Sequence, residues 1–202
     1  MKECKIVVGK MAYSHLTVGV LDLQGAVSEH MQQIRALGAT AIAVKHPEQL
    51  AQLDGLVLPG GESTAMGKLM RYEQFIAAIR QFSQQNKGIF GTCAGMILLA
   101  KALENHEPAH LKLMDICVQR NAFGRQVDSF QTDLHLKGIA TPFPAVFIRA
   151  PYITQVLSPQ VEVLAKFKEN IVLAKQSKLL AASFHPELTD NPAVMRLFLD
   201  LL

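Results

Sequence analysis

Short apolar runs alternate with amphipathic stretches of helical length through the first half of the chain. The runs are rich in strand-forming residues, and the stretches between them repeat apolar residues at helical spacing. This alternation predicts βαβ units with a mainly parallel sheet. The expected strands are 17–23, 40–44, 55–58 and 88–92, and the expected helices are 27–37, 63–84 in two pieces around Tyr72, and 94–103.

The pattern changes after a polar surface loop at 104–110. Strand-like segments then follow one another across short turns that carry Gly, Pro, Ser or Asn, which predicts antiparallel additions to the sheet. These strands are expected at 115–119, 126–134, 161–167, 171–175 and 179–184, and an amphipathic helix at 191–202 closes the chain. The sequence therefore predicts an α/β fold with a mainly parallel central sheet and antiparallel additions.

Composition limits the class of protein further. The chain has 202 residues, of which 50% are hydrophobic and 18% charged, enough for one domain with a full core. Its net charge of +3 comes from scattered basic residues, so no nucleic-acid surface is expected. The apolar stretch 88–100 is too short to span a bilayer, and the N-terminus lacks a signal-peptide pattern. Three widely spaced cysteines suit a reducing compartment, and we expect a cytoplasmic protein.

The segment GIFGTCAG at 88–95 runs from a buried strand straight into a helix, with Cys93 at the junction. Such a turn is tight, so the residues two before and two after the nucleophile must be small, and Gly91 and Gly95 hold these places. The start of the helix also stabilises a thiolate. Because free cysteines are often only small buried apolar residues, this pattern alone leaves a nucleophile and a packing residue both open.

A second candidate is the triplet His185-Pro186-Glu187, directly after the apolar run 179–184. Pro186 biases His185 toward an extended conformation, in which residues two apart project to the same side, so Glu187 can reach the imidazole. The triplet would supply a base and the carboxylate that orients it. Taken alone, it also fits a surface histidine beside an acidic residue at the start of a helix.

A third candidate is LPGGES at 58–63, where a strand meets paired glycines before a helix. Glycines let backbone amides point at an anion or a developing oxyanion. An ordinary strand-to-helix turn with Ser63 as the helix N-cap fits equally well. A phosphate loop is not expected, because the GxxxxGK[ST] spacing is absent and Glu62 stands where a lysine would be needed.

Other features predict no cofactor and no metal. The segment 19–25 looks like a dinucleotide-binding turn, but its glycine spacing does not fit. The remaining histidines show no HxxxH or HExxH spacing, and we interpret them as surface or core residues: His30, His46, His106, His110 and His135.

Together, the GTCAG elbow, the late HPE and the early LPGGES resemble the class I (triad) glutamine amidotransferases. Within that family, the match is sharpest to the glutaminase subunits of pyridoxal 5′-phosphate synthase, and it covers 17–202. The segments that carry it are LDLQGAV (21–27), LPGGEST (58–64), GTCAG (91–95), QRNAFGRQVDSF (119–130), FIRAP (147–151) and FHPELT (184–189).

The resemblance implies a flavodoxin-like three-layer sandwich and hydrolysis of L-glutamine to L-glutamate and ammonia. By this resemblance Cys93 is the nucleophile, His185 the general base and acid, and Glu187 its orienter, while Gly61 and Ala94 supply the oxyanion-hole amides. It also implies that the glutamine site is lined by Gly61, Glu62, Ser63, Arg120, Ile148 and Arg149.

The resemblance further implies a partner, a synthase barrel subunit that receives the ammonia in an assembly of twelve copies of each subunit. No nucleic-acid or membrane partner is implied. Two features depart from the family: Ala65 replaces a common threonine, and residues 1–16 precede the usual start. We therefore expect an N-terminal extension of uncertain order at 1–16 and a single glutaminase domain at 17–202.

Three alternatives remain at this stage. The chain could be a glutaminase subunit of another amidotransferase, such as imidazole glycerol phosphate synthase, which would share the triad but not the RNxFGRQ segment. It could be a flavodoxin-like cysteine hydrolase, against which the HPE triplet argues. It could also be a docking module without turnover, against which the intact Cys93, His185 and Glu187 weigh.

Overall fold

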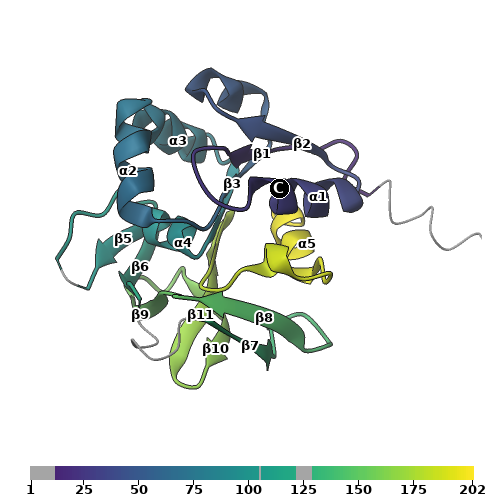
Figure 1. The fold of residues 1–202 in the computed structure, drawn as a ribbon, viewed down its shortest axis with the longest axis vertical. Helices are drawn as coiled ribbons and strands as arrows, with labels where there is room; N and C mark the ends of the chain where they lie inside the picture. Colours follow the sequence, from purple (N-terminus) through teal and green to yellow (C-terminus); the bar gives the residue numbers. More distant parts are fainter. Residues whose placement is uncertain (1–11, 105, 122–128) are drawn as a thin grey trace, which may run out of the picture.

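One large curled sheet, with helices on both faces, forms the body of the computed structural model, which describes residues 12–104, 106–121 and 129–202 (Figure 1). The helices are α1 (Val27–Ala36), α2 (Ser63–Tyr72), α3 (Phe75–Gln84), α4 (Ala94–Leu99) and α5 (Ala193–Leu199), with 3-10 turns η2 (Pro47–Gln52) and η3 (Pro186–Leu188). The strands are β1 (Thr17–Leu21), β2 (Thr40–Val44), β3 (Gly55–Leu58), β4 (Gly88–Thr92), β5 (Ala100–Leu103), β6 (Met114–Gln119), β7 (Ser129–Leu134), β8 (Phe143–Ile148), β9 (Tyr152–Val156), β10 (Glu162–Phe167), β11 (Asn170–Gln176) and β12 (Leu179–Ala182).

The main sheet combines a parallel half with an antiparallel half. Its strand order in the described residues is β2-β1-β3-β4-β12-β11-β9-β6-β5, with β10 also paired to β11. The neighbours from β2 to β12 are parallel, as are β5 and β6, whereas β11 runs antiparallel to β12, β10 and β9. A separate antiparallel hairpin joins β7 and β8. The predicted α/β class with antiparallel additions is therefore confirmed.

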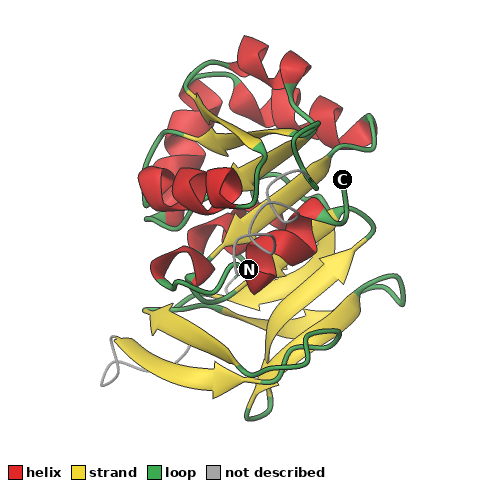
Figure 2. Ribbon diagram, turned by 90° about the vertical axis from the view of Figure 1, so that its right-hand side faces the viewer, coloured by secondary structure: helices red, strands yellow, loops and turns green. Residues whose placement is uncertain are grey.

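Two hydrophobic cores lie on opposite faces of the sheet. Successive residues of β4 point to opposite sides, as in any strand: Ile89 belongs to one core with Phe75 of α3, and Phe90 to the other with Ile34 of α1 and Phe198 of α5. In Figure 2, turned by 90°, helices lie on both sides of the sheet and the antiparallel strands extend beyond them. This is the predicted three-layer arrangement.

The expected break at Tyr72 is confirmed, but the expected helix 94–103 is wrong in its second part. Helix α4 ends at Leu99, and Ala100–Leu103 forms strand β5, which pairs in parallel with β6. A short apolar run fits a buried helix and a buried strand equally well by periodicity. Here the free edge of β6 decides, because pairing with it satisfies the backbone groups of β5.

Strands β8 and β9 were not expected from the sequence. Pro144 lies inside β8 and Pro151 directly precedes β9, and proline argues against a central strand. The structure tolerates Pro144 because β8 belongs to a two-stranded hairpin, in which one side of each strand needs no ladder partner. The expected strand 126–134 corresponds to β7 from Ser129 onward; residues 126–128, and residues 1–11 of the expected extension, lie outside the described part of the chain.

The sheet topology brings the candidate segments together. Strands β1, β3, β4 and β12 are neighbours and parallel, so their carboxyl ends share one edge. Open α/β sheets bind their ligands at this edge. The segments that leave it carry Gln24, Gly60 to Glu62, Cys93 and His185.

Candidate active site

Cys93 occupies a sharp turn between β4 and α4. Its backbone has φ 49° and ψ −103°, a combination that residues with a side chain rarely adopt. The predicted need for glycine on both sides is confirmed: a Cβ at Gly91 would lie 2.5 Å from the carbonyl of Gly95, and a Cβ at Gly95 would collide with the carbonyl oxygen of Leu58. The turn thus presents the sulfur at the strand edge.

His185 and Glu187 form the pair that the triplet predicted. His185 Nδ1 lies 2.7 Å from Glu187 Oε1, and the backbone N–H of His185 donates to the carbonyl of Val146 at 2.8 Å. The side chain of His185 is 12% exposed and that of Glu187 is fully buried. Because Nδ1 is engaged by the carboxylate, the other ring nitrogen is left to exchange a proton with Cys93, which lines the same pocket.

The pKa values of His185 and Glu187 are shifted in the directions that favour the charged form of each side chain. Burial alone would lower the pKa of His185, but its interactions with Cys93 and Glu187 outweigh that effect and raise the pKa to about 10. Burial alone would raise the pKa of Glu187, but the hydrogen bond to His185 and nearby histidines hold it below its usual value. The geometry therefore favours an imidazolium beside the cysteine sulfur, as a nucleophilic site needs.

The PGGE loop, residues 59–62, is held by hydrogen bonds to Gln24 and to the first turn of α2. The backbone N–H of Glu62 donates to Gln24 Oε1 at 2.8 Å. The Glu62 carboxylate caps α2 by accepting from the N–H groups of Thr64 and Ala65 at 3.0 and 2.7 Å, and these bonds hold the pKa of Glu62 below its usual value. The alternative with Ser63 as the helix N-cap does not hold: Glu62 is the N-cap and accepts from the first-turn amides, while Ser63 begins the helix.

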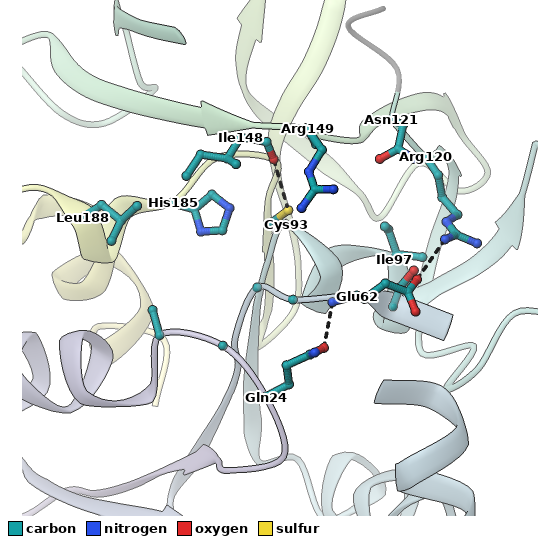
Figure 3. Close-up of a pocket in the computed structure, with 15 residues that line it drawn as sticks. Gln24, Glu62, Cys93, Ile97, Arg120, Asn121, Ile148, Arg149, His185 and Leu188 are labelled. Atoms are coloured by element: carbon teal, nitrogen blue, oxygen red, sulfur yellow. Dashed lines mark hydrogen bonds and ion pairs between the residues drawn. The ribbon is translucent and has the colours of Figure 1, made fainter. Parts of the chain in front are cut away.

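A pocket of about 490 Å³ opens above Cys93 (Figure 3). The structure brings most of the predicted site residues to its wall: Gly61, Glu62, Ser63, Cys93, Arg120, Ile148, Arg149 and His185. Two others lie just behind it, since Glu187 is buried under His185 and Ala94 follows the nucleophile as the first residue of α4. The first-turn amides of a helix have no partner within it, so the position of Ala94 suits an oxyanion donor.

Two arginines give the pocket positive charge, but they differ in their surroundings. Arg120 is held in ion pairs with Glu62 at 3.1 Å and Glu107 at 2.8 Å. Arg149 has φ 41° and shows no ion pair among the described residues. In Figure 3, His185 and Arg149 lie on either side of Cys93, and the Cys93 sulfur faces the carbonyl oxygen of Ile148 at 3.9 Å. Arg149 is thus the better placed of the two to meet an anion.

Seven pocket residues were not predicted as site residues: Gln24, Gly25, Ala26, Gly60, Ile97, Asn121 and Leu188. Gln24 carried a usable signal, because it directly follows the first parallel strand, at the edge where such sheets bind ligands. Asn121 and Leu188 lie inside the family segments 119–130 and 184–189, but neither has a reactive side chain. Ile97 resembles any other apolar residue of a buried helix.

Metal and membrane sites were also sought in the part of the chain that the structure describes. No cluster of three or more His, Cys, Asp or Glu side chains with metal-binding geometry occurs there. No helix of that part is long and apolar enough to cross a bilayer.

Comparisons with known proteins agree with this geometry. The model of the SNO glutamine amidotransferase family matches residues 20–202. A protein of Pasteurella multocida, named pyridoxal 5'-phosphate synthase subunit PdxT, is 65% identical over 189 residues, which cover 94% of this chain and 98% of that protein. A protein of the same name from Niallia circulans is 58% identical, over 93% of this chain and 98% of its own. A crystal structure of a glutamine amidotransferase superimposes with a TM-score of 0.86 at 46% identity, over 91% of this chain and 97% of that one. The chain therefore belongs to the SNO glutamine amidotransferase family.

Proposed function

We propose that the chain is the glutaminase subunit of a pyridoxal 5′-phosphate synthase, which hydrolyses L-glutamine to L-glutamate and passes the ammonia to a synthase subunit. The observation that carries the chemistry is that Cys93 and His185 line one pocket, with the Glu187 carboxylate 2.7 Å behind the His185 ring. The partner and the pathway are supported by family membership and by relatives named as subunits of that synthase.

The first half of the reaction makes a thioester. His185 takes the thiol proton of Cys93 on the ring nitrogen that does not face Glu187, and the resulting thiolate attacks the side-chain amide carbon of glutamine. The amides of Gly61 and Ala94 hold the oxyanion of the tetrahedral intermediate. The imidazolium of His185 then gives its proton to the departing nitrogen, and ammonia leaves.

The second half releases glutamate. Water enters the place that ammonia has left, and His185 removes its proton as it attacks the thioester carbon. Collapse of the second tetrahedral intermediate breaks the C–S bond and restores the cysteine thiolate beside the His185 imidazolium. Throughout, the buried Glu187 carboxylate stabilises the imidazolium and keeps the ring in one tautomer.

The pocket suits the two charged ends of a free amino acid. Arg149 is available for the α-carboxylate, which a guanidinium binds with charge-assisted hydrogen bonds. Arg120, already paired with Glu62 and Glu107, is better suited to fixing the shape of the wall. Carbonyl and carboxylate oxygens of Ile148 and Glu62 face the same space and can accept from the ammonium group.

The proposal includes the setting of the reaction. Ammonia released to water is protonated and loses its nucleophilicity, so a useful subunit must deliver it directly to the partner. We include in the proposal the assembly of twelve copies of each subunit, a cytoplasmic location, and a single glutaminase domain at 17–202. The assembly would be measured as the mass of the mixed complex in sedimentation experiments.

The test is glutamate production from L-glutamine by the purified chain, with and without the synthase subunit, with Cys93→Ala as the matched control. Activity that needs both Cys93 and the partner is the expected result. Activity that does not respond to the partner would move the assignment to a glutaminase of another amidotransferase. No activity in either condition would refute the proposal and favour a cysteine hydrolase or a docking module.

A further inference from the structure

A second histidine lies behind the triad carboxylate and has no place in the mechanism above. His30 belongs to α1, far from the GTCAG and HPE segments in sequence, and its side chain is fully buried. It packs edge-on against the ring of Phe90 in β4, with ring centroids 6.4 Å apart. Sequence patterns could identify it only as a surface or core histidine, because it forms no recognisable spacing with other residues.

The Glu187 carboxylate lies between two imidazole rings. Its Oε1 faces His185 Nδ1 at 2.7 Å, and its Oε2 faces His30 Nε2 at 3.5 Å. The same nitrogen of His30 lies 3.3 Å from Oγ1 of Thr92, the residue directly before the nucleophile. His30 therefore contacts both the residue that orients the base and the strand end that carries Cys93.

Oε2 of Glu187 needs such a neighbour. It is buried, and no hydrogen bond within normal limits reaches it from the described residues. A buried carboxylate oxygen without a donor is costly, and hydrogen bonds in a resting site are often long and shorten when charge develops. An N–H on His30 Nε2 can reach two acceptors, Oε2 of Glu187 at 3.5 Å and Oγ1 of Thr92 at 3.3 Å, whereas His30 Nδ1 is buried without a partner among the described residues.

Burial favours a neutral His30, although the charge of Glu187 acts in the opposite direction. The groups that face it are Glu187 and His185 from the C-terminal segment and Glu29 from its own helix. Burial lowers the pKa of His30, and the charge of His185 acts in the same direction. One carboxylate then balances one imidazolium, on His185, and His30 can act as a neutral hydrogen-bond donor.

We propose that His30 is a positioning residue for the glutaminase reaction: its Nε2–H holds Oε2 of Glu187, so that Oε1 stays directed at His185. Without this contact the carboxylate can rotate about its last bond, and the imidazolium of His185 loses part of its stabilisation. This inference rests on the proposed function for its kinetic readout, but it also makes a prediction about the reactivity of Cys93 that needs no turnover.

The test compares three variants of His30. His30→Gln places an amide N–H where Nε2 was, His30→Asn carries the same amide on a side chain too short to reach, and His30→Leu removes the donor altogether. Ile34→Val is the matched control, because Ile34 lies one turn further along the same buried face of α1 and belongs to the core. Each protein is assayed for kcat and KM with the synthase subunit present, and for the pH dependence of Cys93 alkylation by iodoacetamide.

We expect His30→Leu and His30→Asn to lower kcat about 10- to 100-fold with little change in KM, the range for loss of one hydrogen bond to a charged group. The pH midpoint of alkylation should move upward in both, since a less stabilised imidazolium supports less thiolate. His30→Gln should retain most of both properties, and Ile34→Val should change neither.

Two results would overturn the inference. The first is a folded His30→Leu or His30→Asn variant with unchanged kcat and unchanged alkylation midpoint. The second is an equal loss in His30→Gln and His30→Asn, which would show that the ring is needed for packing and not as a donor. If His30→Leu does not fold, the Gln and Asn pair decides alone. If the unaltered protein shows no glutaminase activity, the proposed function fails, and the alkylation midpoints still test His30.

Discussion

Replacing alanine by glycine at position 93 should cost less stability than the same replacement at a regular position of the sheet. Cys93 has a backbone conformation, φ 49° and ψ −103°, that only glycine adopts without strain. The relevant comparison is Cys93→Gly against Cys93→Ala, because both variants lack the sulfur and differ only in the Cβ. The reference pair is wild type against Ala181→Gly, a fully buried position in β12 outside the residues with positive φ.

The expected difference in free energy of unfolding between Cys93→Gly and Cys93→Ala follows from three contributions. Strain at one residue in a sparsely populated backbone region amounts to about 1–3 kcal/mol, and glycine releases it. Loss of a buried methyl group costs about 0.8 kcal/mol, and the greater backbone entropy of glycine costs about 0.5–1 kcal/mol, together about 1.5 kcal/mol. Subtracting these losses from the released strain, the free energy of unfolding of Cys93→Gly should lie between about 0.5 kcal/mol below and about 1.5 kcal/mol above that of Cys93→Ala. Ala181→Gly releases no strain, so its free energy of unfolding should be about 1.5 kcal/mol below that of the wild type.

Urea unfolding of the four proteins, followed by circular dichroism, measures these differences, provided that the slope of free energy against urea stays constant. Equal losses at positions 93 and 181 would refute the reasoning, because they would mean that the turn stores no strain. Both Cys93 variants should lack glutaminase activity, so the stability difference is read independently of turnover.

The remaining predictions concern charge in the site. Glu187→Gln keeps the shape of the side chain but removes its charge, so kcat should fall about 10²- to 10⁴-fold without reaching the Cys93→Ala background; unchanged turnover in a glutamate-release assay would remove Glu187 from the triad. Arg149→Ala should raise KM for glutamine about 10- to 100-fold with a smaller effect on kcat, and a change confined to kcat would contradict its role in binding the α-carboxylate. The pH dependence of stability should have two limbs. The lowered pKa of Glu187 gives stability above its unfolded value of about 4.3 that is lost as pH falls through the lower folded pKa. The raised pKa of His185 gives stability below about 6.5 that is lost as pH rises through about 10. Urea unfolding at a series of pH values should show both limbs, and Glu187→Gln should flatten the acid one; an unaltered acid limb in that variant would contradict the assignment.

Local sequence patterns predicted those parts of the site whose geometry depends only on residues within one short segment. The glycines at 91 and 95 predicted the elbow, and the spacing of His185 and Glu187 predicted their hydrogen bond, because both depend on the chain within a few residues. The helix expected at 94–103 was wrong because a distant strand, β6, decides the conformation of Ala100–Leu103.

Site residues whose partners are distant in sequence were not predicted. Gln24 and His30 act through residues far away in sequence, Glu62 and Glu187, and nothing in its own segment assigns either of them that partner. Only the strand order, which places the end of β1 and the start of α1 beside the ends of β3, β4 and β12, gives these two residues a role.

The position of β12 has a consequence for the synthesis of the protein. This strand is the last in the chain, yet it lies in the interior of the sheet beside β4, and the Cys93 N–H donates to the carbonyl of Ala182 at 2.8 Å. A nascent chain can complete β1 to β4 while β12 is still inside the ribosome, but the nucleophile then lacks both this backbone bond and the histidine that follows. The catalytic site is therefore complete only after nearly the whole polypeptide has been made.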